Sequence, residues 1–207
     1  MDYQLRSWFY NMMSQNEIEI LKCFFPQLDP LASKDVEDKS GFSHETIFRL
    51  LKALVNKGCL TKRKVGKTNV YEIVKDRDIL YQPFVSYMTE KRLGFKKKHL
   101  LMYKRLYAFL NEINPEGPAI IFGSFAKGTQ TGNSDIDLLC VDNTKNIQEV
   151  SRTFKTKYGI NIQPAVVKTS DFKNIKKDNP VFWNDLIIFG IVLDGLDIFF
   201  REAYLND

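Results

Sequence analysis

Apolar residues recur three and four positions apart over residues 17–25, which predicts a helix with one buried face that a proline ends. A shorter helical stretch over residues 31–39 ends at a Ser-Gly pair, and residues 43–56 then predict a second amphipathic helix with Ser43 as its N-cap. Residues 59–65 and 69–74 are two short strand candidates, and the Gly-Lys-Thr turn between them predicts a β-hairpin.

The middle of the chain, residues 76–114, has a mostly helical pattern, with interruptions expected near Pro83 and Gly94. Two prolines within residues 115–118 end this pattern and indicate the start of a second domain. Residues 119–122 then predict a short buried strand. A helical connection is therefore expected between two folded parts.

The sequence carries a formal net charge of +5, but the placement of its charges is more informative than that total. Residues 43–67 contain seven basic residues and one acidic residue, and residues 91–111 contain seven basic residues and no acidic residue. The rest of the chain is therefore acidic on balance. Basic segments of this kind indicate an anionic partner. The second segment is also compatible with a solvated helix face, a second phosphate-binding surface or a seat for an acidic partner.

The order of elements over residues 17–74, with the phrase Leu-Lys-Ala-Leu-Val-Asn-Lys-Gly-Cys-Leu at residues 51–60, resembles the winged helix-turn-helix family. That resemblance implies contact with duplex DNA. A helix that presents cations and short polar groups, as predicted over residues 43–56, fits the major groove, and a basic hairpin reaches backbone phosphates. The candidates for contact with base edges are Ser43, His44, Thr46, Arg49 and Lys52. The candidates for contact with phosphates are Lys62, Arg63, Lys64 and Lys67. A protein-protein adaptor and a merely solvated basic face stay open, and a homodimer would fit by analogy with such regulators.

The cysteines, the histidines and the apolar runs bear on the cellular compartment, on zinc binding and on membrane association. Cys23, Cys59 and Cys140 are widely separated in apolar runs, so we expect buried, reduced thiols and a cytoplasmic protein. The two histidines lack the spacing of zinc ligands. The longest apolar run, residues 186–193, is too short to span a membrane, and the first residues lack a signal-peptide core. No membrane partner is therefore expected.

Candidate phosphate-binding residues lie immediately after the strand predicted at residues 119–122. Gly123 allows the backbone to turn sharply and to approach a ligand closely. Ser124 and the free amides of the turn can donate hydrogen bonds to phosphate oxygens, and Lys127 adds a cation nearby. This turn therefore predicts phosphate binding.

Two aspartates lie at alternate positions of the next predicted strand, directly after Ser134. Asp135 and Asp137 would project from one face of that strand, while Ile136 and Leu138 would point into the core. Two adjacent carboxylates repel each other unless a cation screens them. Mg²⁺ prefers such oxygen ligands and commonly takes one or two carboxylates together with substrate phosphates. The pair therefore predicts a site for Mg²⁺ and a nucleotide.

The motif Gly-Ser-x-Ala-x-Gly at residues 123–128, followed by Ser-Asp-x-Asp at residues 134–137, resembles the nucleotidyltransferase fold of the DNA polymerase beta superfamily, especially its minimal members. The resemblance extends over residues 118–195 and includes a helix predicted at residues 146–158. It implies transfer of a nucleoside monophosphate from an NTP to a hydroxyl group, with release of pyrophosphate.

The same resemblance implies roles for individual residues. Asp135 and Asp137 would be the catalytic residues and would hold Mg²⁺. The residues that bind the nucleotide would be Gly123, Ser124, Lys127 and Ser134.

One position departs from the pattern of the superfamily. The third metal-binding acid would come from the strand predicted at residues 160–167. Asn161 and Gln163 occupy the positions where that acid is expected. Because that acid helps to hold the metal and to draw a proton from the nucleophile, its loss should leave nucleotide and Mg²⁺ binding more intact than transfer. Asp142, Asp171 or a carboxylate from a partner could substitute for it.

We therefore expect an α/β (α+β) protein with a winged helix over residues 1–90, a basic connecting helix over residues 91–117, and a nucleotidyltransferase-like domain over residues 118–207. The last domain should contain a small mixed sheet flanked by helices. In the first functional hypothesis, the protein transfers a nucleoside monophosphate from an NTP to an unknown hydroxyl with the help of Mg²⁺. In the alternative, it is a DNA-binding transcriptional regulator whose nucleotidyltransferase-like domain binds nucleotide or dimerises without turnover. A pure interaction module is a third possibility.

Overall fold

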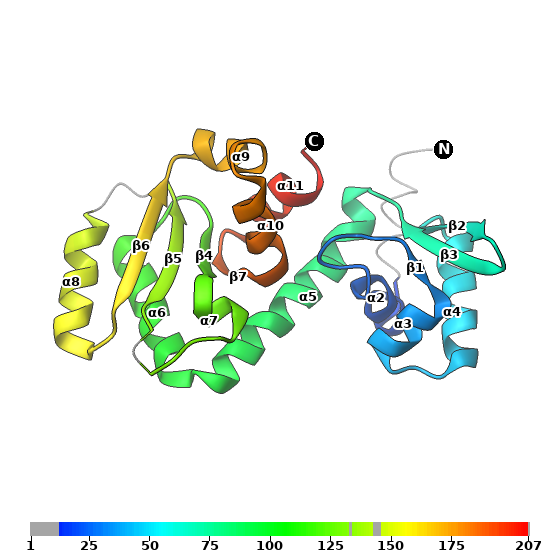
Figure 1. Ribbon diagram of the computed structural model, residues 1–207, viewed down its shortest axis with the longest axis horizontal. Coiled ribbons are helices and arrows are strands. Elements are labelled where there is room, and N and C mark those ends of the chain that lie inside the picture. The colour runs from blue at the N-terminus through cyan, green and yellow to red at the C-terminus, as the bar shows by residue number, and fades with distance from the viewer. Residues whose placement is uncertain (1–12, 133, 143–145, 207) are drawn as a thin grey trace. The chain divides into compact units, whose positions relative to one another are not determined.

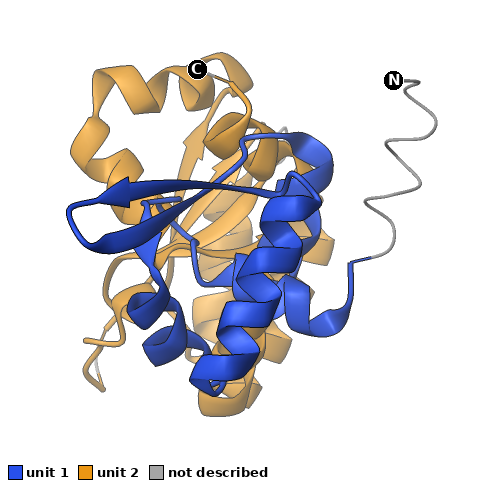
Figure 2. Cartoon of the chain, turned by 90° about the vertical axis from the view of Figure 1, so that its right-hand side faces the viewer, with its two compact units in different colours: residues 1–87, 207 blue, residues 88–206 orange. Residues whose placement is uncertain are grey.

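The computed structural model describes residues 13–132, 134–142 and 146–206 (Figure 1). The chain divides into two compact units, of which the first ends at Tyr87 and the second runs from Met88 to Asn206 (Figure 2). Helix α5, Arg77–Lys98, contributes residues to both units. Among the described helices, none has the length and apolar character that a membrane crossing requires.

The first unit contains a helical part and a three-stranded sheet. Its helices before α5 are α2 (Gln15–Lys22), α3 (Ser33–Ser40) and α4 (His44–Asn56). Its strands are β1 (Leu31–Ala32), β2 (Leu60–Val65) and β3 (Thr68–Ile73). The strands lie in the order β1-β3-β2, and both pairings are antiparallel. Helices followed by a hairpin are confirmed, and the short strand β1 was not predicted.

The strand β1 replaces the start of the helix predicted over residues 31–39. Leu31 pairs with Tyr71 of β3 and is buried, so the sheet takes it up before α3 begins. The amide of Ala32 then donates a hydrogen bond to the carboxylate of Asp35 at 2.8 Å, which satisfies the backbone at the start of α3. A tertiary contact therefore overrides the local helical pattern at two residues.

Helix α4 buries Ile47, Leu50, Leu51 and Leu54 on one face, as the sequence pattern predicts. Ser43 occupies the N-cap position, but its hydroxyl lies 3.0 Å from the hydroxyl of Thr46 and makes no capping bond to a backbone amide.

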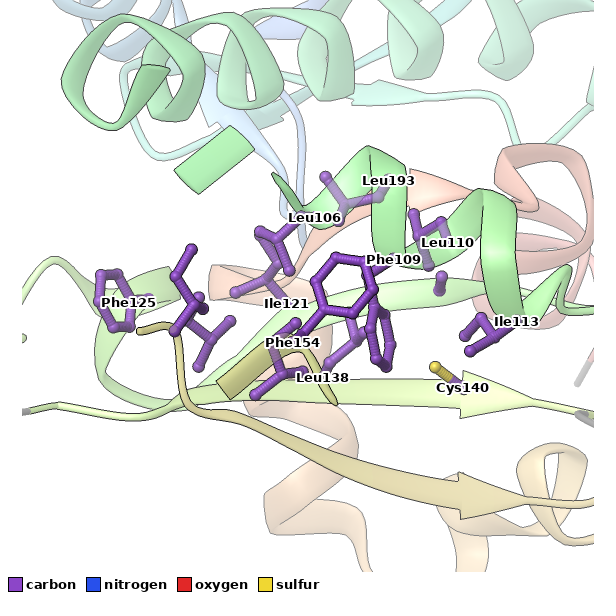
Figure 3. Close-up of a cluster of buried hydrophobic side chains, with 14 of the residues drawn as sticks. Leu106, Phe109, Leu110, Ile113, Ile121, Phe125, Leu138, Cys140, Phe154 and Leu193 are labelled. Carbon is purple, nitrogen blue, oxygen red and sulfur yellow. The ribbon is translucent and has the colours of Figure 1, made fainter. Parts of the chain in front are cut away.

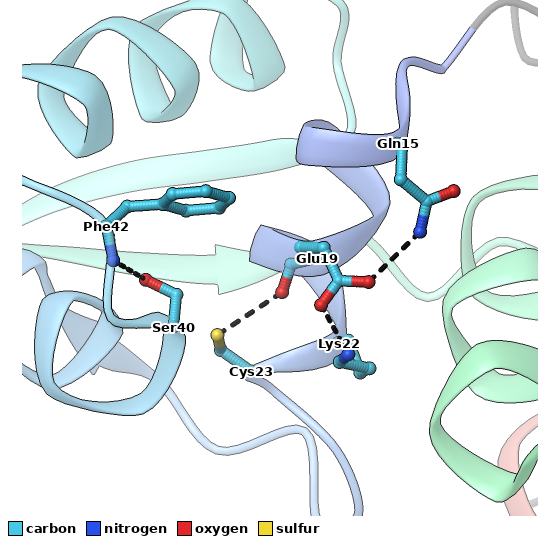
Figure 4. Close-up of polar contacts among 6 residues, drawn as sticks. All are labelled: Gln15, Glu19, Lys22, Cys23, Ser40 and Phe42. Carbon is cyan, nitrogen blue, oxygen red and sulfur yellow. Dashed lines mark hydrogen bonds and ion pairs between the residues drawn. The ribbon is translucent and has the colours of Figure 1, made fainter. Parts of the chain in front are cut away.

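Polar contacts within α2 join its side chains along the helix (Figure 4). Glu19 accepts a hydrogen bond from Gln15 Nε2 at 3.1 Å and forms an ion pair with Lys22, while the thiol of Cys23 donates to the Glu19 carbonyl at 3.3 Å. The buried carboxylate of Glu17 pairs with Lys57 at 2.7 Å, which ties α2 to the end of α4.

All three cysteines are free and buried, as predicted. Burial raises the pKa of the Cys23 and Cys59 thiols to about 11 and that of Cys140 to about 12. The thiols are therefore protonated at neutral pH and act as apolar core groups.

The interruptions predicted near Pro83 and Gly94 are wrong, because α5 runs through both positions and the break lies at His99. Proline removes one helical hydrogen bond. Packing offsets that loss, since Ile79 and Phe84 on either side of Pro83 are 1% and 0% exposed.

The second unit is built on a four-stranded sheet. Its strands are β4 (Ala119–Phe122), β5 (Ile136–Val141), β6 (Ile162–Val167) and β7 (Ile191–Asp194). They lie in the order β6-β5-β4-β7, with β5 and β6 parallel and the other two pairs antiparallel, so the predicted mixed sheet is confirmed. The helices that follow α5 are α6 (Leu100–Ile113), α7 (Gly123–Lys127), α8 (Ile147–Tyr158), α9 (Thr169–Asp178), α10 (Pro180–Phe189) and α11 (Leu196–Tyr204).

One face of the sheet packs against α6 and α8 (Figure 3). Ile121, Leu138 and Cys140 from the central strands belong to this core. The rings of Phe109 in α6 and Phe154 in α8 meet edge to face, with centroids 5.3 Å apart. Helix α6, which lies in the segment predicted to connect the domains, is thus part of the core of the second unit.

Residues that alternate with this core point to the other face, where α10 packs on β4. On this side the rings of Phe172 and Trp183 meet edge to face with centroids 5.7 Å apart, and the tilted rings of Trp183 and Phe199 have centroids 6.2 Å apart. Because strand residues alternate, Asp137 lies on the opposite side of β5 from Ile136 and Leu138, as the sequence predicts.

Candidate functional site

The candidate site begins where β4 ends. Phe122 is the last residue of the strand, and Gly123 starts α7 with a φ of +66°. Residues with a Cβ rarely adopt that backbone conformation, so glycine suits the turn. Ser124 follows in the first turn of α7, where backbone amides have no partner within the helix.

Gly123 also lies directly against Asp137 of the neighbouring strand. Phe122 and Asp137 are partners in the antiparallel pair of β4 and β5, which brings the carboxylate beside the turn. A Cβ added at Gly123 would lie 2.0 Å from Asp137 Oδ2, much closer than such atoms approach each other. The glycine therefore makes room for this carboxylate.

The two aspartates are next to each other at the start of β5. Asp135 immediately precedes the strand and Asp137 is its second residue. Burial, and then repulsion from Asp135, raise the pKa of Asp137. A cation beside the pair would favour the charged carboxylates and oppose that rise.

Two amide side chains reach Asp135 from the adjacent strand β6. Asn161, just before β6, donates a hydrogen bond from Nδ2 to Asp135 Oδ1. Gln163, the register partner of Asp137, donates from Nε2 to Asp135 Oδ2 at 3.3 Å. The residues at the predicted place of the third acid therefore hold one of the two carboxylates instead of adding another.

The acids considered as substitutes lie at the other end of the sheet. Because β5 and β6 run parallel, Asp135 is at their beginning, whereas Asp142 follows the end of β5 and Asp171 follows the end of β6 in α9. Hydrogen bonds from the hydroxyl and the amide of Thr169 lower the pKa of Asp142 and show that it has a structural role. Neither acid is placed to complete the pair.

Lys127 and Ser134 contact different neighbours. Lys127 Nζ forms an ion pair with Asp185 of α10 at 2.6 Å. The Ser134 hydroxyl accepts a hydrogen bond from the amide of Thr131 at 2.8 Å, which closes the turn before Asp135. Sequence reasoning missed Asp185, although a single acid within the apolar sequence of α10 was a usable signal.

The donor chemistry of Asp135 and Asp137 is compatible with Mg²⁺. The ion typically takes one or two protein carboxylates and completes its shell with water and phosphate oxygens. Within the described part of the chain, no three acidic, histidine or cysteine side chains gather where they could hold a metal. A metal at this site would therefore depend on the two aspartates and on ligands from outside the chain.

The predicted nucleic-acid interface lies in the first unit. The N-cap Ser43 and the α4 residues His44, Arg49 and Lys52 are exposed, whereas Thr46 is half-buried. His44 Nδ1 lies 3.3 Å from Glu37 Oε2. Phe48, which sequence reasoning did not single out, is 59% exposed on the same helix.

The wing carries its four basic candidates on exposed positions. Arg63 forms an ion pair with Glu72 across the hairpin at 2.5 Å, and Lys62 Nζ lies over the ring of Tyr71 at 6.0 Å. Lys64 and Lys67 lie toward the tip of the hairpin. The structure thus places the predicted phosphate contacts together on one hairpin.

Comparisons with known proteins also divide the chain into two parts, but the boundary between the two matches falls at residues 104–108, beyond the end of the first unit at Tyr87. Residues 13–104 match the family model of the penicillinase repressor, and residues 108–197 match the family model described as polymerase beta, nucleotidyltransferase.

Two curated relatives are similar to part of the chain. A protein of Methanocaldococcus jannaschii named "Putative protein adenylyltransferase" is 34% identical over 84 residues, which cover 36% of this chain and 56% of that protein. A protein of Pyrococcus abyssi, named as uncharacterized, is 30% identical over 70 residues, which cover 34% of this chain and 21% of that protein. The chain thus spans about half of the length of the first relative and about a fifth of the second.

Among solved structures, the alignment with the archaeal chromatin protein TrmBL2 covers 87% of this chain and 76% of the TrmBL2 chain. The TrmBL2 structure is described as showing a novel mode of DNA binding. The identity is 13% and the TM-score is 0.28, which is too low to indicate a shared fold. Residues 13–104 are thus similar to the winged-helix penicillinase repressor family, and residues 108–197 are similar to the polymerase beta nucleotidyltransferase family.

Proposed function

We propose that the second unit binds an NTP and transfers its nucleoside monophosphate to a hydroxyl group. The observation that carries this proposal is the contact between Gly123 and Asp137. It brings the glycine-serine turn at the start of α7 and a carboxylate pair to one place, and this combination suits a triphosphate bound together with a cation.

Different residues of the chain would bind the phosphates, hold the metal and support the loop. Gly123 and Ser124 would bind phosphate oxygens, and Asp135 and Asp137 would hold Mg²⁺, which when bound screens charge on the triphosphate. Lys127 and Ser134 would support the loop, since Lys127 is paired with Asp185 and Ser134 closes the turn before Asp135.

In the reaction, the hydroxyl oxygen of the acceptor forms a bond to the α-phosphorus. The bond from that phosphorus to the bridging oxygen breaks, and its electron pair leaves with pyrophosphate. The hydroxyl proton passes to water or to the departing pyrophosphate. The name of the Methanocaldococcus relative supports a protein hydroxyl as the acceptor and ATP as the first nucleotide to test.

Incubation of the full chain with Mg²⁺ and labelled NTPs tests this proposal. Label transfer that disappears when Asp135→Asn and Asp137→Asn are combined is the expected result. Saturable nucleotide binding without transfer to any offered acceptor would contradict transfer and would leave only binding.

One observation favours the second candidate function, a regulator that binds nucleotide or dimerises without turnover. Asn161 and Gln163 both donate to Asp135, and the described residues bring no third carboxylate to the pair. No side chain at this position can therefore take a proton from the attacking hydroxyl. If transfer occurs, it should be slow.

We also propose that the winged helix binds duplex DNA. Lys62, Lys64 and Lys67 lie exposed on the wing, and the penicillinase repressor match supports this use of the unit. A homodimer and a cytoplasmic location stay predictions from the sequence.

Affinity for duplex DNA, measured as salt is raised, tests the wing. Neutralising Lys62, Arg63, Lys64 and Lys67 should weaken binding to all sequences and reduce the slope of affinity against salt. If affinity and slope are both unchanged, the wing does not contact phosphates.

A further inference from the structure

A surface that is both basic and apolar lies at the junction of α5 and α6 in the second unit. Three leucines there are 53%, 49% and 60% exposed, and they are three of the seven large hydrophobic side chains exposed among the described residues. Three exposed lysines lie among them in the segment without acidic residues. This junction surface consists of Leu93, Lys97, Lys98, Leu100, Leu101 and Lys104.

Three other basic side chains of residues 91–111 make contacts within the second unit. Arg105 donates to the carbonyl of Tyr158 at 2.7 Å, Lys91 donates to the carbonyl of Ile188 at 2.9 Å, and Lys96 lies over the ring of Tyr103 at 5.5 Å. Among the described residues, Lys97, Lys98 and Lys104 take part in none of the ion pairs that the structure contains. Their charges are therefore available to a partner.

Helical spacing places these residues on common faces. In α6, Leu101 and Lys104 are three positions apart, and Ala108, one turn further, is exposed as well. In α5, Leu93 and Lys97 are four positions apart. Each helix thus presents an apolar side chain beside a cation, which is the chemistry of a protein interface with an acidic partner.

The junction surface adjoins the candidate site. His99, between the two helices, packs against Phe125 of α7 with ring centroids 5.6 Å apart. Its Nε2 lies 3.3 Å from Gln130 Nε2, in the loop that leads from α7 toward Asp135. A partner held at the junction would therefore be next to the segment proposed to bind the nucleotide.

We propose that the junction surface docks a protein whose contact surface combines carboxylates with apolar side chains, and that this protein is the acceptor of the nucleoside monophosphate. The leucines decide between a protein and a nucleic acid, because a phosphate backbone offers them no apolar partner. The role of the docked protein as acceptor rests on the proposed function, whereas the docking does not.

The probe is a fluorescent random copolymer of glutamate and tyrosine, which offers carboxylates, apolar rings and acceptor hydroxyls. Poly-glutamate of equal length is the comparison. Affinity is measured by anisotropy on the full chain, with Lys62, Arg63, Lys64 and Lys67 changed to Gln in every variant so that the wing does not contribute.

Two variants change the junction surface and one is the control. The first combines Lys97→Glu, Lys98→Glu and Lys104→Glu. The second combines Leu93→Ser, Leu100→Ser and Leu101→Ser. The control makes the same change of charge on exposed lysines of α8 and α9, with Lys155→Glu, Lys173→Glu and Lys177→Glu.

The lysine variant should bind the copolymer about tenfold more weakly than the control does. The leucine variant should lose affinity for the copolymer while keeping its affinity for poly-glutamate. Equal binding by the lysine variant and the control would overturn the docking proposal. A loss of duplex DNA affinity in the lysine variant, without loss of copolymer affinity, would assign the surface to phosphates and overturn it as well.

The acceptor role has a separate readout. Label transfer to the copolymer should show a raised KM and an unchanged kcat in the junction variants, with NTP affinity unchanged. Copolymer binding by the wild-type chain without transfer would remove the acceptor role and leave the docking. Transfer that is insensitive to the junction variants would place the acceptor elsewhere.

Discussion

The carboxylate of Asp137 occupies the space where a side chain at Gly123 would be, since a Cβ there would lie 2.0 Å from Asp137 Oδ2. The glycine proposed to bind phosphate and the second aspartate proposed to hold a metal are therefore in direct contact, although 14 positions separate them in the sequence.

Gly123→Ala should disturb both functions of this unit at once. The added methyl group would displace the Asp137 carboxylate, and small displacements of reacting groups can lower rates by about 10²-fold. We expect a loss of at least that size in label transfer, together with weaker Mg²⁺-dependent nucleotide binding in calorimetry.

Gly128→Ala is the matched control for this change. Gly128 also has a positive φ, of +73°, but nothing lies within 4 Å of a Cβ there, so the variant meets backbone strain of about 1 kcal/mol without a clash. Equal loss of nucleotide binding in both variants would show that strain, and not the contact with Asp137, explains the requirement for glycine.

Asp137→Asn should make the protein more stable at neutral pH when Mg²⁺ is absent. The pKa of Asp137 is raised in the folded protein, so its contribution to stability is full below the ordinary aspartate pKa of about 3.9 and is lost as pH rises through the raised value. Asparagine does not ionise and avoids that loss. Thermal unfolding in EDTA should show the difference at pH 7 and a smaller difference near pH 4.

Added Mg²⁺ should then stabilise the wild-type chain more than the Asp137→Asn variant, because only the wild type offers both carboxylates. Identical melting temperatures in EDTA at pH 7, or identical responses to Mg²⁺, would be incompatible with the pair as described.

Asn161→Asp should convert the pair into a three-carboxylate site. Without Mg²⁺ the variant should be less stable than the wild type, since it loses the donor to Asp135 and adds repulsion. With Mg²⁺ its melting temperature should rise more than that of the wild type, and label transfer should increase about tenfold.

Asn161→Ala separates the effects, because it removes the same hydrogen bond without adding charge. If Asn161→Asp responds to Mg²⁺ no more strongly than Asn161→Ala, residue 161 does not reach the metal, and the replaced third acid does not account for slow transfer.

The sequence predicts the parts of this molecule whose signals are local. The apolar spacing of α4, the motif after β4 and the alternation around Asp137 all concern neighbouring residues, and the structure agrees with each of them. The strand at Leu31 and the uninterrupted α5 escaped prediction, because contacts with Tyr71 and the burial of Phe84 decide them.

The same distinction applies to the site. Sequence reasoning identified Asn161 and Gln163 as the residues in place of an acid, but their shared contact with Asp135 depends on the parallel pairing of β5 and β6. The ion pair of Lys127 with Asp185 likewise joins residues 58 positions apart. Spacing along a chain carries no direct signal for such pairs.

Transfer of a nucleoside monophosphate is tested most directly by comparing ATP labelled at the α-phosphate with ATP labelled at the γ-phosphate, with Mg²⁺ and the acidic copolymer as acceptor. We predict that the acceptor gains the α-label only, that one pyrophosphate is released for each label gained, and that both signals vanish when Asp135→Asn and Asp137→Asn are combined. Transfer of the γ-label, or transfer of the α-label that persists in the double variant, would contradict it.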